Sequence, residues 1–180
     1  MVPNTFDAEK FRELLLYVAG KSLDDPTFGA TKLNKIMFFA DFRAYGEFGV
    51  SITGASYQRL DRGPAPVQLL PVQSDLIEEQ AAVLVEREYF NYPQKRLFPL
   101  RQPDLSKFSA AEIALVDEII EALRHHNATE VSFLSHINVL GWQIAGDRED
   151  IPYEAVFLSA ESLTPIDIRR GQEIARRNVS

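Results

Sequence analysis

The stretch that most constrains the fold is residues 31–48, TKLNKIMFFADFRAYGEF, which is apolar on nearly every side. One helical face carries apolar residues at the spacing i, i+3, i+4 and i+7, namely Leu33, Ile36, Met37 and Ala40. Phenylalanines add apolar surface on the remaining sides, so the polar arc is narrow. Because a helix of this kind is covered by neighbours on several sides, the sequence predicts a buried central helix.

Capping and turn signals place the other elements. Thr31 is suited to the N-cap of the central helix, and Gly46 and Gly49 to its end. Pro66 suits the first turn of a later helix, and Thr129 suits another N-cap. Further helices are predicted over 6–20, 66–80 (with a kink or a fresh start at its internal Pro71), 109–127, 130–140 and 165–177, and an antiparallel hairpin over 82–101 with its turn at 91–94. The predicted fold class is α+β and mainly α-helical, with about six to seven helices around the central one.

Length and composition predict one domain over residues 1–180. The apolar content of 46% and charged content of 25% are ordinary for a globular protein. The chain has no cysteine, which excludes disulfides and thiolate metal sites. Its apolar runs are far shorter than the roughly 20 residues that span a bilayer, and the first residues lack the order of a signal peptide. We therefore expect a cytoplasmic protein without a membrane span.

The net charge of −7 bears on possible partners. Affinity for nucleic acid comes from cations that neutralise phosphates, so this charge argues against a nucleic-acid partner. It favours a basic protein instead. The predicted last helix is locally basic through Arg169, Arg170, Arg176 and Arg177, which more often pair with an acidic body than with nucleic acid.

No constellation of residues predicts catalysis or a cofactor. His125 and His126 are adjacent and point about 100° apart on a helix, so they do not share a metal easily. His136 has no histidine or carboxylate at i+3 or i+4. The chain also lacks a G-x-S-x-G nucleophile elbow and both common phosphate-binding loops. We expect a protein that is not an enzyme and that holds neither cofactor nor metal.

Several short motifs follow one another in a definite order. The first is the run 31–41, the second is residues 52–54 followed by Tyr57 and then Gly63-Pro64, and the last are 134–136, Trp142 and 151–154. This series resembles the Panacea domain, the family of SocA-like antitoxins, over residues 10–158. The residues that carry the resemblance are Lys32, Leu33, Lys35, Asp41, Gly63, Pro64, His136, Trp142, Pro152 and Tyr153. The sequence departs from the family pattern at Arg62, where an aromatic residue is usual, and at 137–138, where an acidic pair is usual.

The resemblance implies a function as well as a mainly helical fold. It implies an antitoxin of a bacterial or phage toxin–antitoxin pair, which binds a cognate toxin protein and neutralises it. It also leaves room for a protease partner, because at least one family member acts as a proteolytic adaptor. We expect the partner to contact the stiff bend over 57–66, through Tyr57, Arg59, Arg62 and Pro64, since interfaces favour Tyr and Arg. The alternative for this bend is a purely structural role, with Tyr57 packed on the central helix.

Two other functions remain open at this level. A regulator or adaptor would link a client to a protease or a nucleic acid, and a basic stripe on the last helix would favour it. A small enzyme would assemble a polar pocket from distant residues such as His136, Asp41 and Tyr153. The sequence alone gives neither the identity of the toxin nor the oligomeric state.

Overall fold

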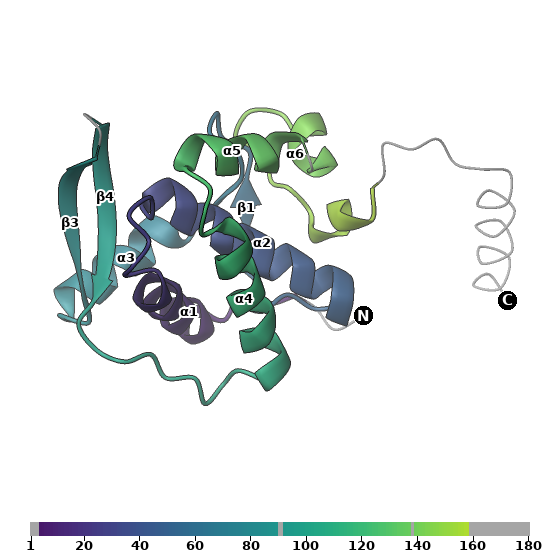
Figure 1. Cartoon of the computed structure of the whole chain (residues 1–180). Helices are drawn as coiled ribbons and strands as arrows, with labels where there is room; N and C mark the ends of the chain where they lie inside the picture. The colour runs from purple at the N-terminus through teal and green to yellow at the C-terminus, as the bar shows by residue number, and fades with distance from the viewer. Residues whose placement is uncertain (1–3, 90–91, 138, 159–180) are drawn as a thin grey trace, which may run out of the picture.

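The computed structural model describes residues 4–89, 92–137 and 139–158 (Figure 1). Its elements within these ranges are six α-helices, four short strands and one 3-10 helix: α1 (Ala8–Lys21), α2 (Ala30–Phe48), β1 (Tyr57–Gln58), β2 (Ala65–Pro66), α3 (Leu69–Glu78), β3 (Ala82–Tyr89), β4 (Tyr92–Pro99), α4 (Ala110–Leu123), α5 (Ala128–Ile137), α6 (Leu140–Ile144) and η1 (Tyr153–Phe157). The strands form two antiparallel pairs, β1–β2 and β3–β4. The predicted fold class, α+β and mainly α-helical, is confirmed.

The centre of the core is α2, as predicted. Helices α1, α4 and α5, strand β2 and η1 all pack against it, and most of its residues are buried. It ends at Gly49, which has a φ of 77° and so adopts the left-handed conformation that favours glycine. This arrangement explains the apolar surface on every side of the helix.

Two details predicted for the ends of α2 are wrong. The helix begins before Thr31, and Gly29 stands at the N-cap without a side-chain hydrogen bond. A Cβ at residue 29 would lie 2.8 Å from Cγ of Gln94, so the close approach of β4 leaves no room for a capping side chain. Gly46 lies inside the helix rather than at its end.

Of the two caps predicted after the hairpin, the structure confirms the one of α4 and not the one of α5. The capping box of α4 is confirmed, because Ser109 Oγ accepts from the N–H of Glu112 and the Glu112 carboxylate accepts from the N–H of Ser109. Thr129 is not the cap of α5, since Asn127 Oδ1 already accepts from the N–H groups of Thr129 and Glu130. The predicted helix over 130–140 corresponds to α5, which ends at Ile137, and Gly141 does not end it but lies within the separate helix α6.

The bend between α2 and α3 contains the first strand pair. Tyr57 pairs with Pro66, and Gln58 pairs with Ala65. Pro66 therefore lies in a strand. The prediction that it lies in the first turn of a helix is wrong. Helix α3 starts afresh at Leu69 with Pro71 in its first turn, where the missing N–H costs no helical hydrogen bond.

The second strand pair is the predicted hairpin, with a shorter turn. Its register runs from Ala82↔Pro99 to Tyr89↔Tyr92, so β4 begins before Lys95. The buried guanidinium of Arg96 donates to three backbone carbonyl groups of the loop between α1 and α2, those of Ser22, Leu23 and Asp25. Strand β4 therefore lies against the body of the molecule, and β3 lies on its outer side (Figure 1).

The structure does not describe the last part of the chain, residues 159–180. The predicted helix over 165–177 and its four arginines lie outside the described residues. Among the helices of the described ranges, none combines the length and the apolar character needed to cross a membrane.

Candidate functional site

The bend over residues 57–66 is held from two sides by later parts of the chain. Strand β1 pairs with β2 on one edge and meets the loop before η1 on the other, where the N–H of Ile151 donates to the carbonyl of Tyr57 at 2.8 Å. The N–H of Arg59 donates to the carbonyl of Glu149 at 3.0 Å. On the same side lie α5 and α6 (Figure 1). The bend is therefore a rigid part of the surface, assembled from segments far apart in sequence.

Gly63 and Pro64 rest directly on α2 and α5. Gly63 has a φ of 93°, and a Cβ there would lie 2.4 Å from Ser135 Oγ and 2.7 Å from Lys35 Nζ. The Nζ of Lys35 donates to the carbonyl of Pro64 at 2.7 Å. Because Lys35 is buried, the pKa of its ammonium falls to about 7. Glycine is required here both for the backbone conformation and for the close approach.

Arg59 and Arg62, two of the predicted contact residues, have different surroundings. The guanidinium of Arg59 stacks over the ring of Trp142 at 4.7 Å from its centroid, and Trp142 Nε1 donates to the carbonyl of Leu60. Arg62 is exposed, while its carbonyl accepts from Ser132 Oγ at 3.1 Å. Of these two arginines, only Arg62 presents its charge freely to a partner.

Tyr57 and Pro64, the other two predicted contact residues, are buried. Tyr57 is 1% exposed, and its hydroxyl lies 2.7 Å from Asp41 Oδ2 and 2.9 Å from the carbonyl of Met37. Its ring packs edge-on against Phe38. Tyr57 therefore has the structural role that was the alternative for the bend. It anchors the bend to α2, and its side chain is not available to a partner.

Asp41 is the buried polar centre beneath the bend. Its carboxylate also accepts from the N–H and the hydroxyl of Thr53, at 2.7 and 2.5 Å. Burial raises the pKa of Asp41 to about 6, although these hydrogen bonds favour the charged form. The nearby Tyr153 donates its hydroxyl to the carbonyl of Ala55 at 2.6 Å, and burial raises its pKa as well. These groups join α2, the bend and η1.

A second buried polar cluster surrounds Lys32. Its Nζ donates to Asp25 Oδ2 at 2.5 Å, to Thr27 Oγ1 and to the carbonyls of Arg124 and His126. Burial alone would raise the pKa of Asp25, but the hydrogen bonds from Lys32 and Thr27 hold it below its ordinary value. This cluster joins α2 to the loop before it and to the end of α4. It is a structural ion pair rather than a surface site.

Sequence reasoning did not predict the roles of Asp25 and Thr53 in these clusters or the contact of Ser135 with Gly63, although Thr53 and Ser135 lie within the motif series. A usable signal was present in the central helix. Lysines 32 and 35 and Asp41 interrupt a helix that is otherwise apolar on all sides. Buried charges need partners, so this pattern predicts polar groups arriving from other segments, although it does not say which.

The surface beside the bend carries exposed apolar side chains. Phe133 of α5 is 59% exposed and Ile144 of α6 is 71% exposed. The bend, α5 and the loop after α6 also carry exposed acidic residues, namely Asp61, Glu130, Asp147, Glu149 and Asp150, and the loop carries an exposed cation, Arg148. We call these apolar and acidic residues, together with Arg62, the bend surface. Its composition suits a basic partner that also buries apolar area.

The residues proposed for an alternative enzyme do not form an open site. Asp41 is 0% exposed and its oxygens are occupied by Thr53 and Tyr57. His136 lies on α5, but its side chain is outside what the structure describes. In the described ranges, no group of three or more His, Asp or Glu side chains could hold a metal ion.

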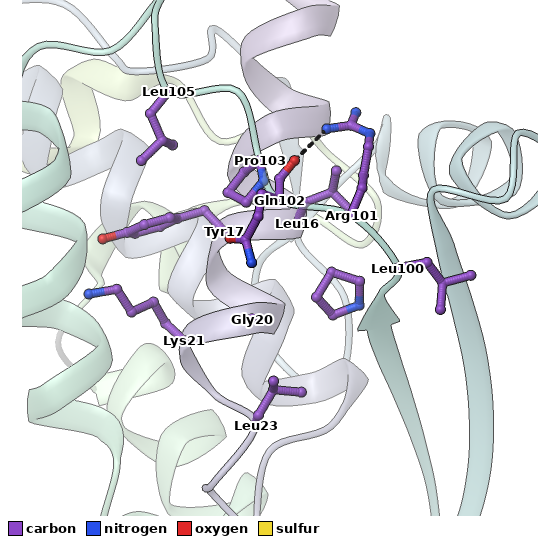
Figure 2. Close-up of a pocket in the computed structure, with 11 residues that line it drawn as sticks. Leu16, Tyr17, Gly20, Lys21, Leu23, Leu100, Arg101, Gln102, Pro103 and Leu105 are labelled. Carbon is purple, nitrogen blue, oxygen red and sulfur yellow. Dashed lines mark hydrogen bonds between the residues drawn. The ribbon is translucent and has the colours of Figure 1, made fainter.

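A groove of about 600 Å³ lies elsewhere, between α1 and the segment after β4 (Figure 2). Leu16, Gly20 and Leu100 line it, with Tyr17 and Lys21 at one side. None of its lining residues is an acid or a histidine, and none is a predicted site residue. The groove therefore does not provide an acid–base pair for catalysis.

Most of the chain, including the whole bend, matches a known protein family. A family model described as antitoxin SocA-like, Panacea domain, matches residues 33–143. This range is more than half of the chain and runs from α2 to α6, with the whole bend inside it. The chain belongs to this family. Neither the curated proteins nor the solved structures gave a match to the chain.

Membership of the SocA-like Panacea family gives the site a context. It suggests a role in a toxin–antitoxin system, with a protein as partner and no enzymatic activity of the chain itself. Several residues that carry the family resemblance are buried: Lys32, Leu33, Lys35, Asp41, Gly63 and Pro64. Trp142 and Tyr153 are half-buried, and Pro152 is exposed. In this Panacea domain, the motif residues mainly build the scaffold that supports the bend.

Proposed function

We propose that this Panacea domain is an antitoxin that binds a cognate toxin protein through the bend surface and thereby neutralises it. The observation that carries the proposal is the family match, which covers the whole bend, most of α2 and all of α5, although the loop at 149–151 and η1 lie after it. Cytoplasmic action and a basic toxin fit the net charge of −7. The domain contributes no chemistry of its own.

The architecture of the bend supports this use. Its backbone is fixed by Pro64, by the Lys35 hydrogen bond and by the loop at 149–151, so binding orders little additional chain. Exposed apolar groups on α5 and α6 offer area that a partner can bury. Arg62 and the surrounding acids provide charges that select one partner over another.

The function is tested by expressing the product of the adjacent gene with and without this chain. We expect that the neighbour alone stops growth, that co-expression restores growth, and that the two proteins copurify. Measuring the amount of neighbour protein separates two modes of action. An unchanged amount supports occlusion by direct contact, whereas a protease-dependent decrease supports delivery to a protease. A harmless neighbour that does not copurify would contradict the proposed function.

The contact surface is tested by Arg62→Glu. This change reverses an exposed charge in the bend surface, so we expect loss of growth rescue and at least about tenfold weaker binding of the neighbour, which corresponds to about 1.4 kcal/mol. Thermal stability should stay within about 0.5 kcal/mol of the parent, because Arg62 uses only its backbone carbonyl in the fold.

The control is Lys107→Glu, which makes the same change of charge at an exposed residue before α4 but also breaks an ion pair with Glu9, so its thermal stability is measured as well. It should keep full rescue. If both variants rescue equally well, the bend surface is not the contact surface. If Arg62→Glu loses stability and rescue together, the role of the residue is in the fold.

A further inference from the structure

The outer edge of β3 is an open edge of the hairpin. Among the described residues, β3 and β4 pair only with each other. Strand β4 faces the body of the molecule, where it contacts α1 and α2, while β3 lies on its outer side and contacts α3 (Figure 1). An unpaired strand edge presents rows of N–H and C=O groups to any extended segment that approaches.

The two prolines of β4 fix which backbone groups point outward. In an antiparallel pair, residues alternate between those that bond across the ladder and those whose N–H and C=O point away from it. Pro93 and Pro99 have no N–H to donate across the ladder. They lie six positions apart, so both fall in the same class of the alternation, and that class is the outward-pointing one. Lys95 belongs to the same outward-pointing class. Its carbonyl faces Gly29, on the side of β4 away from β3.

The register transfers this alternation to β3. Pro93 pairs with Glu88 and Pro99 with Ala82, so the outward-pointing residues of β3 are Ala82, Leu84, Glu86 and Glu88. The last three have exposed side chains. By contrast, the outer edge of β4 lacks donors at both prolines and is approached by the loop before α2. The two edges of the hairpin therefore differ, and only that of β3 can accept a strand.

We propose that the outer edge of β3 binds an extended segment of a partner protein in which basic and apolar residues alternate. Such a segment would extend the two-stranded sheet by one strand. Its basic side chains would lie beside Glu86 and Glu88 on one face of the sheet, and its apolar side chains beside Val83 and Val85 on the other. The partner's alternation matches these four residues, while Leu84 shares the face of the glutamates and Arg87 shares the face of the valines.

Charge disfavours a second copy of this chain as the occupant when two β3 edges pair around Glu86. Two β3 edges paired antiparallel around Glu86 would place these glutamates opposite each other, and like charges in that position are destabilising. The inference goes beyond the proposed toxin binding, because it rests on the register and exposure of the hairpin and not on the bend surface.

The test uses the full chain and two synthetic peptides, each as long as the eight-residue β3. One alternates lysine with valine, and the other alternates glutamate with valine. Fluorescence anisotropy should show saturable binding of the lysine peptide and none of the glutamate peptide. In hydrogen-exchange NMR, the amides of Leu84, Glu86 and Glu88 should become protected when the lysine peptide binds. Those of the intervening residues, already bonded to β4, should not change.

A pair of proline variants tests the edge itself. Glu86→Pro removes one outward N–H and should weaken binding of the lysine peptide by at least about tenfold. Lys95 is the cross-strand partner of Glu86, and Lys95→Pro removes one outward N–H from the opposite edge of the hairpin. This variant should bind the lysine peptide as tightly as the parent chain does. Equal binding by the two variants, or no binding by the parent chain, overturns the proposal.

A charge variant keeps the test decisive if a proline disturbs folding. Glu86→Lys/Glu88→Lys retains the backbone of the edge and should exchange the preference, binding the glutamate peptide and losing the lysine peptide. The control Asp75→Lys/Glu78→Lys makes the same charge change on exposed residues of α3 and should keep the original preference. A preference that follows net charge alone, and so changes in both variants, overturns the proposal. Growth rescue by these variants is scored separately, so a failed peptide test is distinct from failed toxin neutralisation.

Discussion

Single buried polar residues connect the helices of this domain to its bend. Asp41 gathers Thr53 and Tyr57 around one carboxylate, and Lys35 reaches the carbonyl of Pro64. Each such group lost its hydration on folding, so its charged state has a free-energy cost that hydrogen bonds offset only in part. The stability of the domain should therefore depend on pH in a way that can be assigned to individual residues.

For Asp41, stability should decrease as the pH rises from about 4 to about 6. The pKa of this carboxyl is raised from its ordinary value of 3.8 to about 6, so the native state binds a proton more tightly than the unfolded chain between these values. Asp41→Asn should remove this part of the pH dependence. Urea unfolding at a series of pH values measures it, and a variant with the same profile as the parent would contradict the assignment.

For Lys35, the sign is reversed. Its pKa is lowered from 10.5 to about 7, so the native state binds fewer protons between these values and stability should increase with pH across that range. Lys35→Met should abolish the increase and should cost about 1–3 kcal/mol at pH 10, because the carbonyl of Pro64 loses its donor. Lys107→Met, at an exposed lysine, is the control and should retain the increase.

At the scale of elements, α2 organises the molecule and the bend is fitted onto it. Local pattern predicted α2, the hairpin and the capping box of α4, because each signal lies within a few neighbouring residues. It failed at Thr31 and Pro66, where a contact from another segment decides the outcome, and at Thr129, where Asn127 accepts from the first N–H groups of α5. At Gly29 the approach of β4 excludes a capping side chain, and at Pro66 pairing with Tyr57 extends the strand.

The candidate site was predicted only in part for the same reason. Its location in the bend comes from local turn residues and from the family resemblance. The partners of Tyr57 lie 16 and 20 positions away in sequence and that of Lys35 lies 29 positions away, while two of the partners of Lys32 lie 92 and 94 positions away. No local pattern contains such contacts, so sequence reasoning left two roles open for Tyr57, contact with a partner and packing on the central helix.

Two glycines with similar backbones test how tightly the bend fits. Gly63 and Gly49 both have positive φ, but a Cβ at Gly63 would meet Ser135 and Lys35, whereas one at Gly49 would meet nothing within 4 Å. Gly49→Ala should cost about 1–2 kcal/mol from backbone strain alone. Gly63→Ala should cost distinctly more, with loss of the Lys35 contact. Thermal unfolding of the two variants compares them directly, and equal costs would show that the bend can move away from α2.

At the scale of the whole molecule, the acidic surface should govern how a partner arrives. With a net charge of −7, a basic partner is attracted before contact, and salt screens this attraction over about 8–10 Å at physiological ionic strength. The association rate with the product of the adjacent gene should therefore decrease as salt is raised, while the dissociation rate changes less. Surface plasmon resonance at several salt concentrations measures both rates. An association rate that is independent of salt would indicate a partner held mainly by apolar contact.

The contact of Arg96 has a consequence for how such a chain can diverge. Its guanidinium meets the loop between α1 and α2 through main-chain carbonyls, which every amino acid supplies. Leu23 and Asp24, whose side chains are exposed, are thus free to vary without loss of this attachment, whereas Asp25 is held by its pair with Lys32. Residue 96 has no such freedom, because lysine lacks the planar fork that serves three acceptors at once. Among related chains, variation should collect at positions 23 and 24 and be scarce at position 96.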